Sequence, residues 1–296
     1  MKVSGFTIVR NAIKYDYPVV ESIRSILPLC DEVIVAVGNS DDGTRDLVAS
    51  IGSPKIRIID TVWDESLRKG GEVLAVETNK ALDAISPDST WAIYIQADEV
   101  LHEEGYQKLR ECMLKWESDK EVEGLVLDYL HFYGSYDYIG DSRKWYRKEV
   151  RIIRNDKKIR SYKDAQGFRR DGKKLKVRLT GAVMCHYGWV KPPEFIRSKL
   201  QYFHTLWHDE QWMEKNKASL ESFDYSEIDS LALFGGTHPT TMKERISGKN
   251  WKFDFDPTRK KFPLVSRFLY WVEKKTGILI GEYRNYKVLK NYLNTD

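Results

Sequence analysis

The sequence predicts an α/β fold in which a mostly parallel, twisted sheet is flanked by helices. Up to about residue 132, short apolar runs alternate with amphipathic segments, as in doubly wound folds. The apolar runs that we expect to be strands are residues 5–9, 32–37, 55–59, 91–95 and 123–132. The segments that we expect to be helices are residues 16–29, 45–51, 72–85 and 102–117.

The run at 91–95, with the polar residues that follow it, is the segment around which we expect the rest of the chain to be organised. The run is apolar on both faces and too short for a helix, which indicates a buried strand. Asp98 and Glu99 follow at its carboxyl end, where open parallel sheets bind ligands. Adjacent carboxylates there suit a divalent cation shared with phosphate oxygens. The alternative is that Glu99 caps the next helix and that Asp98 is solvated.

The pattern changes after residue 132. Residues 133–146 are rich in Tyr, Gly and Asp and are expected to form a loop, followed by strands at 149–154 and 174–183. An aromatic helix is expected over 194–217. We therefore expect one α/β domain over residues 1–190 and a helical, aromatic-rich extension over residues 191–296.

Composition limits the classes of function. A net charge of +4 does not suggest a protein that coats nucleic acid. Cys30, Cys112 and Cys185 are odd in number and far apart, which fits a reducing compartment and argues against a disulfide framework or a zinc ribbon. The chain shows no signal-peptide pattern and no apolar run of membrane-spanning length. We expect a cytoplasmic protein, with a place at the inner face of the cell membrane left open.

Polar side chains follow three predicted strands. They are found at residues 10–11, 39–42 and 96–99, and the carboxyl ends of parallel strands meet at one edge of a sheet. Lys69, in the segment Arg68-Lys69-Gly70-Gly71, is a further candidate for phosphate contact because glycines permit close backbone approach. Taken alone, each segment also fits an ordinary turn, and residues 39–44 fit an Asx turn with a helix cap.

Rival signatures are absent from the sequence. No Gly-x-Gly-x-x-Gly follows the first strand, and neither a P-loop nor a Gly-x-Ser-x-Gly elbow occurs. These absences disfavour a dinucleotide dehydrogenase, a P-loop NTPase and an α/β-hydrolase.

The segments 6–11, 37–44 and 96–99, in that order, resemble a family 2 glycosyltransferase of the GT-A type, and the resemblance covers residues 3–190. It implies an inverting enzyme that moves a sugar from a nucleotide diphosphate sugar to a hydroxyl of a glycan or lipid-linked acceptor. Bacterial surface polysaccharide synthesis is the setting that it suggests. The residues implied in nucleotide-sugar binding are Arg10, Asn11, Asn39, Asp41, Asp42, Lys69, Gln96 and Asp98.

Asp41 is the implied contact to base or ribose, and Asp98 is the family's acid that reaches the metal and the diphosphate. Gln96 stands where the first acid of the family's Asp-x-Asp pattern is usual. The implied metal ligands are Asp98, Glu99 and His186, and the implied ion is Mn²⁺ or Mg²⁺. From the residues alone, a histidine hydrogen-bonded to a backbone carbonyl stays open as the explanation of His186.

An inverting transfer requires a general base within reach of the acceptor hydroxyl. The candidates are Asp137, Asp141, Asp164 and Asp171. Asp164 is preferred because it lies between the 149–154 strand and His186, as the base does in the family. A solvated turn residue is the alternative.

Two other features permit two explanations each. His204 and His208 lie four residues apart on a predicted helix and are interpreted as structural or as part of an acceptor cleft. The basic, aromatic segment 259–271 either packs as a last core helix, which we favour, or rests on an anionic membrane. Alternative functions are a nucleotidyltransferase that makes sugar nucleotides and a non-catalytic glycan-binding or assembly protein.

Overall fold

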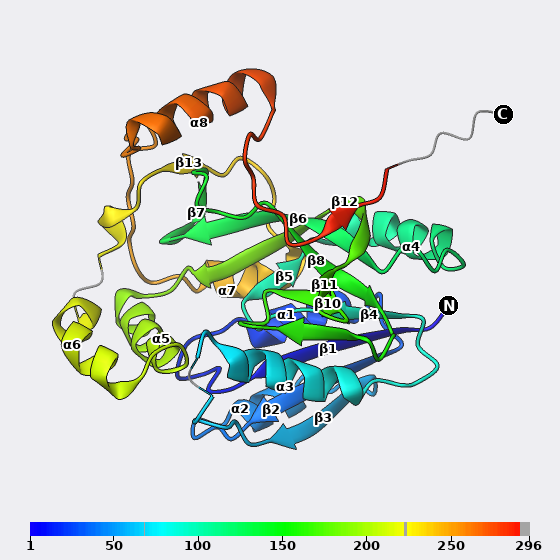
Figure 1. Ribbon diagram of the computed structural model, residues 1–296. Helices are drawn as coiled ribbons and strands as arrows, with labels where there is room; N and C mark the ends of the chain where they lie inside the picture. Colours follow the sequence, from blue (N-terminus) through cyan, green and yellow to red (C-terminus); the bar gives the residue numbers. More distant parts are fainter. Residues whose placement is uncertain (68, 222–223, 291–296) are drawn as a thin grey trace.

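A computed structural model describes residues 1–67, 69–221 and 224–290. The chain forms a large α/β sheet with helices on both faces, so the predicted fold class is confirmed (Figure 1). Within the described residues this sheet has eleven strands, and its main path runs β13-β7-β6-β8-β4-β1-β2-β3. A small sheet of three strands, in the order β11-β10-β9, lies beside it.

The first half of the chain builds the parallel part of the sheet. Its strands are β1 (Val3–Val9), β2 (Glu32–Gly38), β3 (Ile56–Thr61) and β4 (Trp91–Tyr94). Phe6 pairs with Ile34 of β2 on one side and with Tyr94 of β4 on the other. The carboxyl ends of these strands consequently meet at one edge, as the sequence predicts.

Alternate residues of the parallel strands pack into two different cores, because successive side chains point to opposite faces. One core holds Val3, Val9 and Ile93 with the helices α1 and α4, and the other holds Phe6 and Tyr94 with α3 and the small sheet. The bounds are α1 (Val19–Ile26), α2 (Thr44–Ala49), α3 (Glu72–Asp83), α4 (Tyr106–Lys115), β9 (Ile159–Tyr162), β10 (Gly167–Arg170) and β11 (Lys173–Lys174).

The second half adds strands of mixed direction. They are β5 (Glu99–Leu101), β6 (Gly124–Tyr133), β7 (Ser135–Gly140), β8 (Lys148–Arg154), β12 (Lys176–Trp189), β13 (Leu231–Leu233) and β14 (Lys287–Val288). The long strand β12 runs parallel to β6 and antiparallel to β5, where His186 pairs with Glu99. This pairing brings a segment from late in the chain to the carboxyl end of β4.

Two sequence expectations about these segments are wrong, and so is the alternative that Glu99 caps a helix. Residues 133–146 are not only a loop, because they contain β7, whose Tyr136 and Tyr138 are buried. The helix expected over 194–217 is divided into α5 (Pro193–Thr205) and α6 (Glu210–Glu221). Asp209 accepts a hydrogen bond from the Trp212 backbone N–H, which caps α6 and starts it anew. Glu99 lies in a strand and caps no helix.

The remaining elements belong to the C-terminal part. They are α7 (Lys243–Ser247), α8 (Leu264–Thr276) and 3₁₀ turns at Glu103–Gly105, Tyr225–Glu227 and Thr240–Met242. The strands β13 and β14 join the main sheet, and the division at residue 190 stays a prediction. The helix α8 lies on the outside of the molecule and is not a core helix (Figure 1). Among the described helices, none has the length and apolar composition needed to cross a membrane.

A buried ion pair joins the two halves of the sheet. Glu99 and Arg151 have fully buried side chains, and the guanidinium donates to both carboxylate oxygens at 2.7 and 2.9 Å. The Tyr129 hydroxyl donates to the same carboxylate at 2.8 Å and the Gln96 backbone N–H donates at 3.1 Å. Both charges are therefore paired and hydrogen-bonded, which burial of a charge requires.

Substitution of Arg151 by alanine leaves Glu99 as an unpaired buried charge. We expect Arg151→Ala to lower the free energy of unfolding by about 3–5 kcal/mol. The control is Arg160→Ala, which breaks the partly exposed pair with Asp83 and is expected to cost at most about 1 kcal/mol. Urea denaturation measures both, and equal losses in the two variants would contradict this account.

Glu149, also on β8, gives a pH-dependent expectation. Burial raises the pKa of this carboxyl to about 7, although Arg151 and hydrogen bonds from Asn285 and Gln166 oppose the rise. The folded state then holds a proton that the unfolded state releases, so Glu149 makes the protein less stable as the pH rises from about 4.5 to about 7.

The variant Glu149→Gln lacks this titration. Its melting temperature relative to wild type should increase over that pH window and level off above it. Thermal melts of both proteins from pH 4 to pH 8 measure the difference. A difference that is independent of pH would show that Glu149 is charged in the folded state.

Candidate functional site

A cavity of about 430 Å³ lies at the carboxyl ends of β1 and β4, and residues of α5 form another part of its wall. Five of the predicted site residues line it: Arg10, Gln96, Asp98, Asp164 and His186. The rest of the wall is largely aromatic, with Tyr17, Trp63, Tyr94, Tyr146, Trp189, Tyr202 and Phe203. A largely apolar cavity with a few convergent charged groups is typical of a small-molecule site.

Asp98 is held by two basic side chains. Its Oδ2 lies 3.0 Å from the Lys199 Nζ and 3.7 Å from the His186 Nε2. Burial alone raises the pKa of Asp98, but the ion pair with Lys199 opposes it, and the pKa stays below its ordinary value. Asp98 is therefore a carboxylate. A Cβ at Gly188 would lie 2.6 Å from the same oxygen, so only glycine leaves room for this arrangement.

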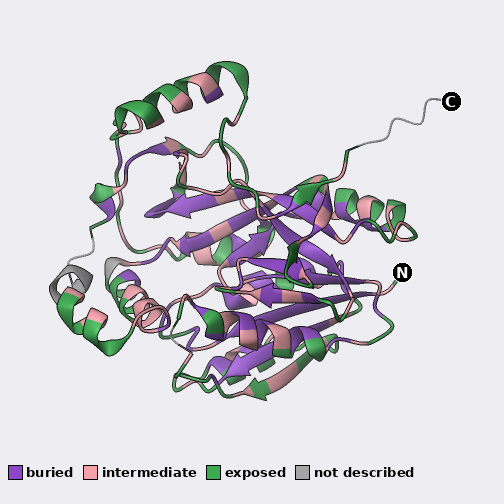
Figure 2. Cartoon of the chain, in the orientation of Figure 1, coloured by how far each residue is buried: buried purple, intermediate pink, exposed green. Residues whose placement is uncertain are grey.

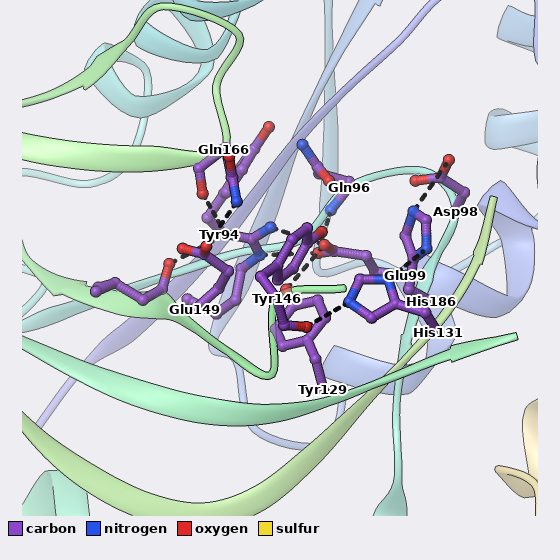
Figure 3. A network of polar contacts seen from close by, with 12 residues as sticks. Tyr94, Gln96, Asp98, Glu99, Tyr129, His131, Tyr146, Glu149, Gln166 and His186 are labelled. Carbon is purple, nitrogen blue, oxygen red and sulfur yellow. Dashed lines mark hydrogen bonds and ion pairs between the residues drawn. The ribbon is translucent and has the colours of Figure 1, made fainter. Parts of the chain in front are cut away.

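A pair of histidines sets the proton positions beside Asp98 (Figure 3). The His131 Nε2 lies 2.7 Å from the Tyr146 carbonyl oxygen, which only accepts, so this nitrogen carries the proton. Burial lowers the pKa of both His131 and His186, which favours neutral rings. The His131 Nδ1 then accepts from the His186 Nδ1 at 3.2 Å. The His186 Nε2 is left with a free lone pair on the side of Asp98.

The open explanation of His186, a histidine tied to a backbone carbonyl, describes its neighbour His131 instead. An imidazole lone pair and a carboxylate oxygen 3.7 Å apart are both acceptors, and a cation between them suits this donor set. Asp98 and His186 thus fit a divalent ion as two ligands. The other ligands would come from phosphate oxygens or water.

Glu99 does not fit the predicted role of metal ligand. Arg151, Tyr129 and the Gln96 N–H occupy its carboxylate, and the residue is fully buried. Among the residues that the structure describes, no group of three or more His, Cys, Asp or Glu side chains is arranged to hold a metal. An ion at this site would depend on oxygens of the bound ligand.

Asp164 lies on the turn between β9 and β10, and it is the one candidate base of the four that lines the cavity. Its neighbours Lys163 and Ala165 both have positive φ, 55° and 59°, which makes the turn tight. Gly71 packs against it, because a Cβ there would lie 3.0 Å from the Asp164 Cβ. The Asp164 carboxylate is half-buried and makes no hydrogen bond or ion pair with another described side chain.

The other three candidate bases have different surroundings. Asp141 is bound by Ser230, Lys260 and Tyr270, and Asp137 by Ser135 and Lys249. Asp171 is an exposed turn residue with a φ of 47°.

Arg10 is positioned at the cavity by polar and aromatic contacts. Its guanidinium donates to the Asn39 carbonyl at 3.1 Å and to Glu65 at 2.9 Å. It also lies 5.7 Å from the Trp63 ring centroid and 5.8 Å from that of Tyr202. Together with Lys199, it brings positive charge to the cavity wall.

The predicted loop 39–44 forms its own hydrogen-bond network beside the cavity. Asn11 accepts from the Asp41 N–H at 3.1 Å, and Asn39 accepts from the Trp63 N–H at 3.2 Å. Asp42 accepts from the backbone N–H groups of Lys14 and Thr44, and the second bond forms an Asx turn just before α2, whose N-cap is Gly43. These contacts are those of the Asx-turn alternative.

Asp41 forms an exposed ion pair with Lys14 at 3.0 Å. Neither it nor Asn11, Asn39 or Asp42 lines the cavity. Lys69 is exposed before α3 and does not line it either, and Arg68 falls outside the described residues.

Sequence reasoning missed Lys199, His131 and the tyrosines of the wall. A signal existed for Lys199, because it interrupts the apolar stripe of Ile196, Leu200 and Phe203 on α5. His204 lines the cavity and its ring stacks on those of His208 and Trp212, which agrees with a structural or cleft role.

No protein-family model and no curated protein matches the sequence. Solved structures match weakly. The S. aureus TarS 1-349 structure in complex with UDP has 15% identity and a TM-score of 0.39, with 68% of this chain and 64% of TarS 1-349 covered. Glucosyl-3-phosphoglycerate synthase from Mycobacterium tuberculosis, in complex with Mn²⁺, UDP and phosphoglyceric acid, has 16% identity and a TM-score of 0.31, with 44% and 43% covered.

A third similar structure is 4-diphosphocytidyl-2C-methyl-D-erythritol synthase from Anaerococcus prevotii, with 12% identity and a TM-score of 0.39. The match covers 68% of this chain and 96% of that structure's chain. The chain spans less than two thirds of the length of the TarS structure and of the glucosyl-3-phosphoglycerate synthase structure. At these scores the similarities carry no argument about activity, which has to come from the cavity itself.

Proposed function

We propose that the chain is an inverting glycosyltransferase of the GT-A type. It moves a hexose-type sugar from a nucleotide diphosphate sugar to an acceptor hydroxyl. The observation that carries the proposal is the content of one cavity: the Asp98–His186 pair, the cations Arg10 and Lys199, and the separate carboxylate of Asp164. These groups match the needs of a diphosphate leaving group and of a hydroxyl nucleophile.

The donor's diphosphate is placed beside Asp98. Lys199 has three N–H donors, and two of them serve Asp98 and the Gly188 carbonyl at 3.0 and 2.9 Å. The third is free to donate to a phosphate oxygen from the cavity wall. A divalent ion bound to Asp98 and His186 would offset the negative charge that develops on the leaving group.

The acceptor is placed beside Asp164. Its carboxylate takes the proton of the acceptor hydroxyl as the oxygen bonds to the anomeric carbon. The bond from that carbon to the phosphate oxygen breaks at the same time, and the nucleoside diphosphate leaves. A single displacement inverts the anomeric centre. The aromatic wall supplies faces for the base and the sugar rings.

The acceptor class that we propose is a glycan or lipid-linked hydroxyl in surface polysaccharide synthesis. The rival functions are a nucleotidyltransferase and a non-catalytic glycan-binding protein. The half-buried Asp164 carboxylate in the cavity favours the transferase, because binding alone does not require a base there.

Nucleotide binding is the first test. We expect the melting temperature to rise with one of UDP, GDP, CMP or dTDP, and to rise further with Mn²⁺, because a ligand that binds only the folded state stabilises it. In Asp98→Asn the Mn²⁺-dependent part of the shift should disappear. The control Asp137→Asn changes an exposed acid away from the cavity and should leave the shift unchanged. No shift with any nucleotide would rule out a nucleotide site.

The role of Asp164 is tested by kinetics. Asp164→Asn keeps the size of the side chain but removes the base, so kcat should fall by about 10²–10⁴-fold while the nucleotide-induced shift is retained. Asp171→Asn, on the next turn, is the matched control and should keep full activity. A fall in kcat of less than about threefold in Asp164→Asn would show that another group is the base.

A further inference from the structure

The helix α8 presents its apolar side chains to solvent. Leu264 is 83% exposed, Val265 71%, Phe268 61% and Trp271 57%. Leu264, Phe268 and Trp271 follow at intervals of four and three residues, so they share one face of the helix. Figure 2 shows α8 as largely exposed on the outer side of the molecule.

The opposite face of α8 attaches to the protein through polar contacts. Glu273 is buried and forms ion pairs with Arg147 at 2.5 Å and Arg143 at 3.5 Å. The Tyr270 hydroxyl donates to Asp141 at 2.7 Å. An ordinary surface helix buries its apolar face and exposes its polar one, so α8 is oriented the other way round.

The segment around α8 is strongly basic. Residues 257–278 contain six Lys and Arg residues and a single acid, Glu273. Glu273 and one of the cations, Lys260, are turned inward, and Lys260 pairs with Asp141. Arg267, Lys274 and Lys275 are exposed on the helix next to the apolar face. Ile278, Ile280 and Tyr283, just after the helix, are exposed as well. An apolar face bordered by cations is complementary to anionic headgroups above an apolar layer.

We propose that α8 docks the protein on an anionic lipid bilayer, with Leu264, Phe268 and Trp271 inserted among the lipids. Arg267, Lys274 and Lys275 contact the headgroups. A second copy of the chain is a less suitable partner for α8, because a symmetric contact would bring these three cations close to the same three cations of the other copy, and like charges repel. The proposal rests on α8 and the residues next to it and is independent of the activity of the cavity.

Vesicle co-sedimentation of the full chain tests the proposal. We expect binding to vesicles of phosphatidylcholine with phosphatidylglycerol, and little binding to phosphatidylcholine alone. The double variant Lys274→Glu/Lys275→Glu should bind the anionic vesicles at least about tenfold more weakly, since each basic residue near an anionic surface adds to the attraction. Added salt should weaken wild-type binding in the same way.

The apolar contribution is tested by Phe268→Ser/Trp271→Ser, which should lose binding without a large change in melting temperature, because both side chains are exposed. Leu114→Ser is the matched control: Leu114 is 58% exposed on α4, and its substitution should leave binding unchanged.

If the wild-type protein did not bind vesicles that contain phosphatidylglycerol, that result alone would overturn the proposal. A concentration-dependent dimer in light scattering that Phe268→Ser/Trp271→Ser abolishes would equally overturn it, in favour of self-association.

Discussion

The ion pair between Glu99 and Arg151 is the interaction on which the site depends. It lies where β4 ends and β5 begins and fixes Glu99 against β8, and Glu99 does not line the cavity. The neighbouring Asp98 lines the cavity, where Lys199 and His186 meet it. The two adjacent acids, labelled in Figure 3, thus have separate roles. Glu99 forms the ion pair that joins the strands, and Asp98 lines the cavity.

A chain of hydrogen bonds links His131 on β6 and His186 on β12, next to Asp98. The Tyr146 carbonyl determines the proton position of His131, and His131 determines that of His186. The orienting partner of a ligand histidine is usually a carbonyl or a carboxylate. The His186 Nδ1–H donates to another histidine instead, and burial lowers the pKa of both rings, which favours their neutral forms.

The sequence predicts the edge of the sheet at which the cavity lies, because four apolar runs and their polar ends are visible without tertiary information. It also predicts Asp98, Asp164 and His186, which meet in one cavity although they come from distant segments. It does not reveal that the carboxylate of Glu99 is paired inside the protein, since its partner Arg151 is 52 residues away. Nor does it separate Asp41 and Asp42 from the cavity, because an acid in an Asx turn and a ligand-binding acid have the same local pattern.

The helix α8 shows a further limit of pattern reasoning. Its periodicity indicates an amphipathic helix, but periodicity does not state which face turns inward. That choice is made by Arg143 and Arg147, which lie far away in the sequence and pair with Glu273. A buried charged group is stable only when it is paired, so Glu273 has to face Arg143 and Arg147. An apolar face can remain in water at a cost in free energy, and contact with a lipid surface removes that cost. The polar contacts therefore fix the orientation of α8 and leave its apolar face available to a bilayer.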